Sequence, residues 1–190
     1  GSANEFDGSV LAEQQQVVVV TLNFRVGAFG FLDFSKFGSE YLGSASNGIQ
    51  DCILALKWIQ DNIEEYGGDP DNVTISGESS GGTMTLGLLG CPSAYSLYHK
   101  AIACSPTCPY KDLEDPTEKV RSALNIDSDN YLSPMLEMSA IDICRLELGF
   151  RVSIDGEVVK TPTIQAIKSR GQNGVPLLVG SNSREGTLYT

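Results

Sequence analysis

The chain has 190 residues, a length that suits one domain with a core of its own. Its 13 Lys and Arg against 24 Asp and Glu give a formal net charge of −11. A surface of this sign repels nucleic-acid phosphates and anionic membrane surfaces, so neither is an expected partner.

The first third of the chain is predicted to form a strand, a loop and a helix. Residues 16–24 (QVVVVTLNF) are a continuous apolar, β-branched run, which is typical of a strand buried on both faces. Residues 25–48 are rich in Gly, Phe and Ser and are expected to form a surface loop. Residues 48–66 repeat apolar side chains at three- and four-residue steps, which indicates an amphipathic helix. The repeating positions are Ile49, Ile53, Leu56, Ile59 and Ile63.

Strands and helices alternate along the rest of the chain. The further predicted elements are, in order, a strand at 72–76, a helix at 80–89, a strand at 100–105, helical patches at 114–124 and 139–148, a helix at 163–169 and a strand at 175–181. This alternation predicts an α/β fold with a mostly parallel central sheet flanked by helices. In such folds an active site is expected at the carboxyl ends of the strands.

A serine motif stands between the strand at 72–76 and the helix at 80–89. Gly77-Glu78-Ser79-Ser80-Gly81 matches G-x-S-x-G, a weak pattern alone that becomes specific with a strand before it and a helix after it. A sharp turn there would lift the Ser79 hydroxyl clear of the sheet, with Gly77 and Gly81 leaving room. Ser79 is the predicted nucleophile, and the Ser80 backbone N–H, at the helix start, is the predicted oxyanion donor. The alternative is a glycine-rich turn with two incidental serines.

Several segments resemble the type-B carboxylesterase and cholinesterase group of α/β-hydrolases. These are LNFRVGAFGFL at 22–32, NGIQD at 47–51, YGGDPDNVT at 66–74, GESSG at 77–81, DG at 155–156 and GSNSREG at 180–186. Together they are far more specific than the serine motif, although the match fades between residues 106 and 151. The resemblance implies that residues 1–190 are a partial α/β-hydrolase domain, incomplete at both ends, whose substrate is a small-molecule carboxylic ester.

The resemblance also assigns the acid of the triad. The family's glutamate in G-x-N-x-D-E-G corresponds to Glu185, which follows a predicted strand and so falls at the same sheet edge as Ser79. The sequence departs from the family pattern at Arg184, which replaces an aspartate and could weaken the role of the glutamate. Cys52 replaces a glutamine, and 104–106 (CSP) replace Gln-Ser-Gly. None of these changes removes a catalytic group.

Two parts of such a site are not found in the sequence. The triad order is Ser, acid, His, and no histidine follows Glu185; the single histidine, His99, precedes a strand, so it is not expected to be the base. The family's oxyanion glycines are expected to lie before residue 1. Loss of the base costs several orders of magnitude in rate. Loss of an oxyanion donor costs roughly 10²–10³. The isolated chain should therefore be nearly inert, with the remaining N- and C-terminal parts of the same protein as its expected partners.

The favoured hypothesis is ester hydrolysis through a Ser-His-Glu triad and an acyl-serine intermediate. A non-catalytic binding or adhesion module on the same fold stays open, as does an inactive truncated product. Binding members of the family typically lose the serine, whereas GESSG is intact here. Glu78 beside the nucleophile favours neutral or cationic esters.

Neither a metal nor another cofactor is expected. Of the five cysteines, Cys104 and Cys108 have the spacing of a ligand pair, but a second pair and a histidine cluster are missing. The cysteines are expected to be buried thiols, with a local disulfide only in an oxidising compartment. No apolar run is long enough to span a bilayer, and no secretory leader opens the sequence, which leaves secreted and cytoplasmic locations both open.

Overall fold

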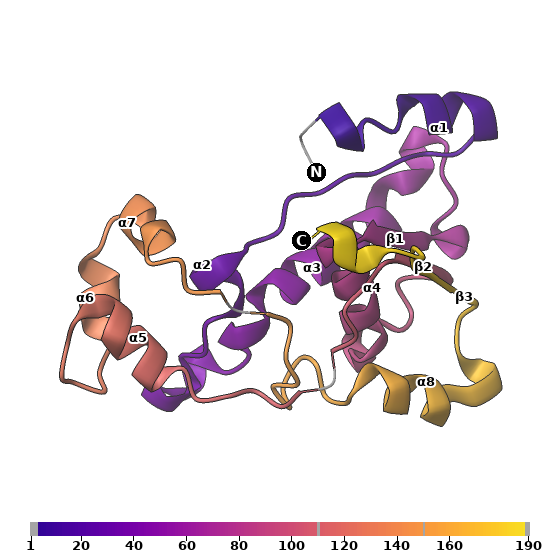
Figure 1. Ribbon diagram of the computed structural model, residues 1–190. Coiled ribbons are helices and arrows are strands. Elements are labelled where there is room, and N and C mark those ends of the chain that lie inside the picture. The colour runs from indigo at the N-terminus through magenta and orange to yellow at the C-terminus, as the bar shows by residue number, and fades with distance from the viewer. Residues whose placement is uncertain (1–3, 110, 150, 189–190) are drawn as a thin grey trace.

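Three strands form one parallel sheet in the computed structural model, which describes residues 4–109, 111–149 and 151–188 (Figure 1). The strands are β1 (Thr74–Glu78), β2 (Lys100–Cys104) and β3 (Leu177–Gly180), in the order β1-β2-β3. In the register, Ile75 lies opposite Ala101, and Ala101 lies opposite Leu177. The prediction of a parallel sheet is confirmed, with each strand within two residues of its expected start.

Helix α4 (Ser80–Leu89) packs on this sheet and is the centre of the main core. It contacts β1 and β2, and α3 (Asn47–Asn62) and α8 (Thr163–Arg170) contact α4 in turn. Alternate strand residues Ile75, Ala101 and Ala103 are buried, because neighbouring residues of a strand point to opposite faces. The helices predicted at 80–89 and 163–169 are confirmed.

The predicted amphipathic helix is also confirmed, as α3 continued by the 3-10 helix η5 (Ile63–Tyr66). Its predicted apolar positions are buried, except Ile59, which is partly buried and packs against the same core. Gly67 ends the helix with φ 80, and the Gly68 N–H donates to the Ile63 carbonyl. A positive φ at this position favours glycine, as at many helix ends.

The strand predicted at residues 16–24 is wrong. The chain forms α1 (Ser9–Gln15), and the following segment runs without regular structure towards α2 (Gly27–Phe31) (Figure 1). Val17, Val18 and Val20 are exposed. A strand requires a hydrogen-bonded neighbour, and the described residues place none beside this run.

A group of three helices lies at the far side of the molecule from β3 (Figure 1), and side chains there form a second apolar cluster. It contains α5 (Thr117–Leu124), α6 (Leu132–Glu137) and α7 (Ala140–Arg145). The helical patches predicted at 114–124 and 139–148 are confirmed as α5 and α7, while α6 was not predicted. Tyr131 is buried at its centre and donates its hydroxyl to the Asp33 carbonyl at 2.5 Å.

Short 3-10 helices make most of the remaining turns. They are η1 (Asn4–Phe6), η2 (Ser35–Phe37), η3 (Ser39–Tyr41), η4 (Ser44–Ser46), η6 (Pro70–Asn72), η7 (Pro92–Ala94), η8 (Gly171–Asn173) and η9 (Glu185–Leu188). With α2, the helices η2 to η4 occupy much of the segment predicted as a loop. None of the helices in the described ranges is long and apolar enough to cross a membrane.

Candidate active site

Ser79 lies on a sharp turn between β1 and α4. Its backbone has φ 54 and ψ −117, a conformation that a residue with a side chain seldom adopts. The Ser79 N–H donates to the Cys104 carbonyl at 2.9 Å, and its carbonyl accepts from the Thr83 N–H at 3.0 Å. These bonds tie the strained residue to the end of β2 and to the first turn of α4.

Two glycines make this turn sterically feasible. A Cβ on Gly77 would lie 2.2 Å from the Gly81 carbonyl carbon, and a Cβ on Gly82 would lie 2.9 Å from the Cys104 carbonyl oxygen. Apart from its chain neighbours and the nearby backbone of α4, a Cβ on Gly81 would meet no described atom within 4 Å. The expectation that Gly77 and Gly81 together make room therefore holds for Gly77, while the second close approach is at Gly82.

The start of α4 offers hydrogen-bond donors beside the exposed serine. Ser80 is the first residue of this ten-residue helix, and the first N–H groups of a helix have no carbonyl partner within it. The positive end of the helix dipole is at the same place. Ser79, Ser80 and Glu78 are all exposed. The arrangement can present a hydroxyl and N–H donors to a ligand, next to one carboxylate.

Glu185 opens η9, just after β3, and two neighbours hold its carboxylate. The Ser105 hydroxyl and the Asn182 N–H each donate to the same Glu185 Oε1 at 2.5 Å. The Asn182 amide also approaches the Ser105 hydroxyl oxygen at 3.4 Å. The hydrogen bond from Ser105, followed by that from Asn182, lowers the pKa of Glu185 from its ordinary value. The carboxylate is thus kept ionised and fixed in position.

A direct chain of contacts connects Ser79 with Glu185. Cys104, whose carbonyl accepts from Ser79, is followed by Ser105, whose hydroxyl donates to Glu185. The Ser105 N–H in turn donates to the Gly180 carbonyl at 2.7 Å, which joins the ends of β2 and β3. The two residues predicted from the sequence therefore lie at the same carboxyl edge of the sheet.

Ser105 and Asn182 were not predicted as partners of Glu185. The available signal was that both follow strand ends on the edge that carries Ser79. Arg184, which the sequence indicated as a possible disturbance, is exposed and forms no ion pair with Glu185 within the described residues. It does not contribute to the lowered pKa of Glu185.

His99 lies at the opposite, amino edge of the sheet. It directly precedes β2, its N–H donates to the Val73 carbonyl at 2.8 Å, and its Nδ1 accepts from the Val73 N–H at 3.2 Å. A strand rises about 3.3 Å per residue, so the length of the five-residue strand β1, roughly 13 Å, separates His99 from the serine turn. This placement agrees with the expectation that His99 is not the base.

The five cysteines are free thiols, and their exposure differs from the expectation. Cys52 and Cys91 are buried, and burial raises the pKa of each thiol to about 12. Cys104 and Cys144 are exposed, so the prediction of buried thiols is wrong for these two. Within the described ranges, no group of three or more His, Cys, Asp or Glu side chains is arranged to hold a metal ion.

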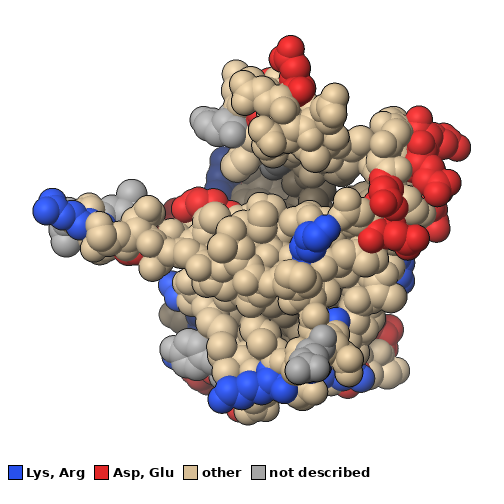
Figure 2. Space-filling model, turned by 90° about the vertical axis from the view of Figure 1, so that its right-hand side faces the viewer, with Lys and Arg blue, Asp and Glu red and all other residues tan. Residues whose placement is uncertain are grey.

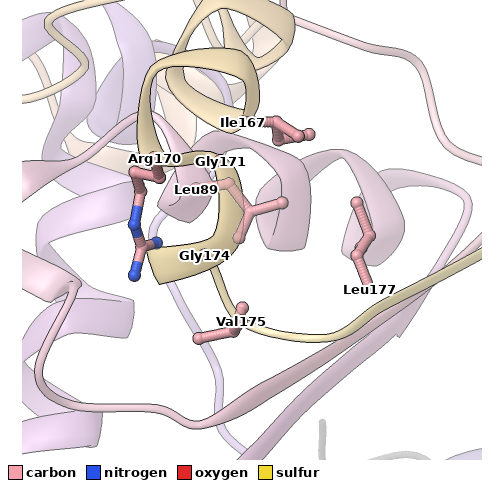
Figure 3. A pocket seen from close by; sticks show the side chains of 7 residues that line it. All are labelled: Leu89, Ile167, Arg170, Gly171, Gly174, Val175 and Leu177. Atoms are coloured by element: carbon pink, nitrogen blue, oxygen red, sulfur yellow. The ribbon is translucent and has the colours of Figure 1, made fainter.

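A small pocket lies between the end of α8 and the start of β3 (Figure 3). Leu89, Ile167, Val175 and Leu177 line it, together with Arg170 and two glycines. Its volume is about 50 Å³. Sites for small organic ligands usually measure about 300–1,000 Å³, so this pocket is too small to hold an ester substrate.

Comparison with known proteins identifies the family. The whole of residues 1–190 matches the model of the carboxylesterase family. The para-nitrobenzyl esterase of Bacillus subtilis (strain 168) is 36% identical over 205 residues, which cover 100% of this chain and 41% of that protein. Fumonisin B1 esterase of Sphingopyxis macrogoltabida is 33% identical and is covered to 37% of its length. The chain belongs to the carboxylesterase family.

Solved structures agree with this assignment. The crystal structure of a Geobacillus stearothermophilus carboxylesterase superposes with a TM-score of 0.89 at 32% identity, covering 100% of this chain and 42% of that one. The fold is therefore that of the α/β-hydrolases, as the sequence predicted. The chain spans about two fifths of the length of these three relatives.

Proposed function

We propose that this chain carries the nucleophile and the acid of a carboxylic ester hydrolase. Ser79 would attack the ester carbonyl, Glu185 would orient a histidine, and the Ser80 N–H would contribute to the oxyanion hole. The observation that carries the proposal is the backbone of Ser79, with φ 54 and ψ −117 between β1 and α4. Strain of this kind persists only where surrounding contacts enforce it, and it is concentrated at functional sites.

The proposed reaction proceeds in two acyl transfers. A histidine takes the proton of the Ser79 hydroxyl while the oxygen bonds to the carbonyl carbon, and the same histidine then protonates the departing alcohol. Water, deprotonated by the histidine, next attacks the acyl-serine and releases the carboxylic acid and the free serine. Both steps form an oxyanion that N–H groups at the start of α4 would stabilise.

The histidine would come from outside these 190 residues. His99 is the single histidine of the sequence and lies at the amino edge. The relatives are more than twice as long as this chain, which leaves ample sequence for a base and for further oxyanion donors. We therefore propose that residues 1–190 are part of one α/β-hydrolase domain, completed by other parts of the same protein.

The charge around Ser79 favours neutral or cationic esters over anionic ones. Glu78 is exposed beside the nucleophile, the Glu185 carboxylate is kept ionised, and the whole chain has a net charge of −11. A neutral arylalkyl ester, of the kind named for the Bacillus subtilis relative, is a suitable first substrate.

Labelling with a fluorescent fluorophosphonate probe tests the proposal. The probe is added to an extract of the source, the protein is captured with an antibody against residues 1–190, and the sample is run on a denaturing gel. A labelled band well above 20.4 kDa is expected, because the base would belong to a longer polypeptide. The same coding sequence with Ser79→Ala should give no labelled band.

The other outcomes have distinct meanings. A labelled band at the mass of this chain, lost in Ser79→Ala, would mean that a separate partner supplies the base. Absence of label at every mass would contradict ester hydrolysis and favour a binding module or an inactive product on the same fold.

A further inference from the structure

Two strained serines lie at neighbouring strand ends. Ser79 has φ 54 and Ser105 has φ 48, both in a region that a residue with a side chain rarely adopts. Ser105 holds the Glu185 carboxylate and is itself held by its bond to the Gly180 carbonyl. The distance from the nucleophile to the acid thus depends on how firmly the segment 104–107 is attached to the serine turn.

The hydroxyl of Thr83 connects this segment with the serine turn. Thr83 is in the first turn of α4, and its Oγ1 donates to the Ser79 carbonyl at 3.2 Å. The same oxygen accepts from the Thr107 N–H at 2.9 Å. A threonine hydroxyl has one hydrogen to donate and lone pairs to accept, so both bonds form at once.

Together with the backbone of the segment 104–107, these bonds form a closed ring that includes Ser79 and Thr83. On one side of Ser105, the Ser79 N–H donates to the Cys104 carbonyl. On the other side, the Thr83 hydroxyl joins the Ser79 carbonyl to the Thr107 N–H. The segment also lies against α4, because a Cβ on Gly82 would be 3.2 Å from the Pro106 Cβ. Thr83 is the side chain that completes the ring.

We propose that Thr83 is a positioning residue that fixes the spacing between Ser79 and the Ser105–Glu185 pair. This inference rests on the proposed function. The Thr83 hydroxyl bonds to the backbone of Ser79 and Thr107. These two bonds involve neither the Ser79 hydroxyl nor the Glu185 carboxylate. A histidine must receive the Ser79 proton while Glu185 orients it, so a loosened spacing would lower turnover more than substrate binding.

Four variants, made in the protein expressed from its complete natural coding sequence, test this inference. Thr83→Val removes the hydroxyl at nearly constant shape, and Thr83→Ser keeps it. Thr85→Val is the matched control, because the Thr85 hydroxyl donates to the Gly81 carbonyl at 3.0 Å, the same four-residue contact, without a bond to the segment 104–107. Thr83→Ala provides a second removal of the hydroxyl if the valine variant does not fold.

The readouts are kcat and KM with the neutral arylalkyl ester, and the thermal unfolding midpoint, which reports whether each variant is folded. Loss of a bridging hydroxyl is expected to lower kcat about threefold to tenfold with KM unchanged. Thr83→Ser should restore kcat, and Thr85→Val should match the wild type. A kcat that is unchanged in Thr83→Val, or lowered equally in Thr83→Ser or Thr85→Val, overturns the inference.

Ser79→Ala separates this result from the proposed function. Hydrolysis that persists in Ser79→Ala, or is absent from the wild type, overturns the proposed function and this inference with it. Hydrolysis that depends on Ser79 but not on the Thr83 hydroxyl overturns the inference alone.

Discussion

Gly77 lies directly beneath the Ser79 turn, where the backbone of β1 meets the backbone of α4. A Cβ there would lie 2.2 Å from the Gly81 carbonyl carbon. A Cβ on Gly81 would meet no described atom within 4 Å apart from its chain neighbours and the nearby backbone of α4. Because the Gly77 contact is with backbone, a rotamer change cannot relieve it, and the turn itself must move. The requirement for glycine in this motif is therefore steric and specific to position.

Gly77→Ala and Gly81→Ala form a matched pair for this point. We expect Gly77→Ala to lower the free energy of unfolding by about 3 kcal/mol, the upper end of the cost of overpacking. Gly81→Ala should be neutral or stabilising by about 0.5 kcal/mol, because alanine restricts the unfolded chain and favours the helix. Urea unfolding of both variants measures the difference. Equal losses of stability in the two would show that the Gly77 contact does not determine the turn.

At the scale of elements, an ion pair ties the start of α2 to α3. The Arg25 N–H, which precedes α2, donates to the Asp51 carboxylate at 2.8 Å, and the Arg25 guanidinium binds both carboxylate oxygens at 2.8–3.2 Å. The hydrogen bonds from Arg25 lower the pKa of Asp51. The Arg25 side chain is 50% exposed and that of Asp51 is 23% exposed, so water screens the pair.

Replacement of Asp51 should therefore have a modest effect that depends on pH. We expect Asp51→Asn to lower the free energy of unfolding by about 1 kcal/mol at neutral pH. The folded pKa of Asp51 is depressed, so its contribution is present above the unfolded pKa and is lost as the pH falls through the folded value. Urea unfolding of both proteins from neutral to acidic pH checks this. A gap in stability that stays constant across that range would contradict it.

The sequence predicted the helices whose apolar period is visible in the chain itself, but not the pairing of strands. The apolar period of residues 48–66 predicts α3 and η5, because one face of a helix must be buried whatever covers it. The run 16–24 has the composition of a strand, but composition does not supply the neighbouring strand that a ladder requires. Helix α6, which was not predicted, has Pro134 in its first turn, where proline is tolerated although it breaks a helix interior.

The candidate site also has a part that the sequence could predict and a part that it could not. The motif around Ser79 is continuous in sequence and could be predicted, and so could its place after a strand. Ser105 and Glu185 are 80 residues apart, and their hydrogen bond depends on the register of β2 against β3. The contact of Gly82 with the end of β2 likewise depends on packing between elements, which sequence spacing does not report.

At the scale of the whole molecule, α2 joins two apolar clusters. Phe31 belongs to the main core around α4, while Ala28 and Leu32, the residue that follows α2, belong to the cluster with α5, α6 and α7. Figure 1 shows these three helices standing apart from the sheet, on the side away from β3. Because α2 contributes side chains to both clusters, the position of α5 to α7 relative to the main core depends strongly on α2.

The opposite side of the molecule carries β3, whose outer edge is unpaired within the described residues. Leu178 is 64% exposed and Val179 is 52% exposed, although they point to opposite faces of the sheet. This side faces the viewer in Figure 2 and is mostly uncharged, with acidic groups gathered along one margin. An apolar strand with a free edge is a template for pairing with another chain.

The 190-residue chain in isolation is therefore expected to self-associate through β3, and sedimentation velocity over a range of concentrations can measure this. Leu178→Lys should raise the monomer fraction severalfold, because a charge on an edge strand opposes pairing. Leu136→Lys is the control, because Leu136 is 71% exposed and lies in the helix α6 and not in a strand. Since both variants change the charge equally, an equal rise in monomer for the two would mean that general solubility, and not the edge of β3, governs association.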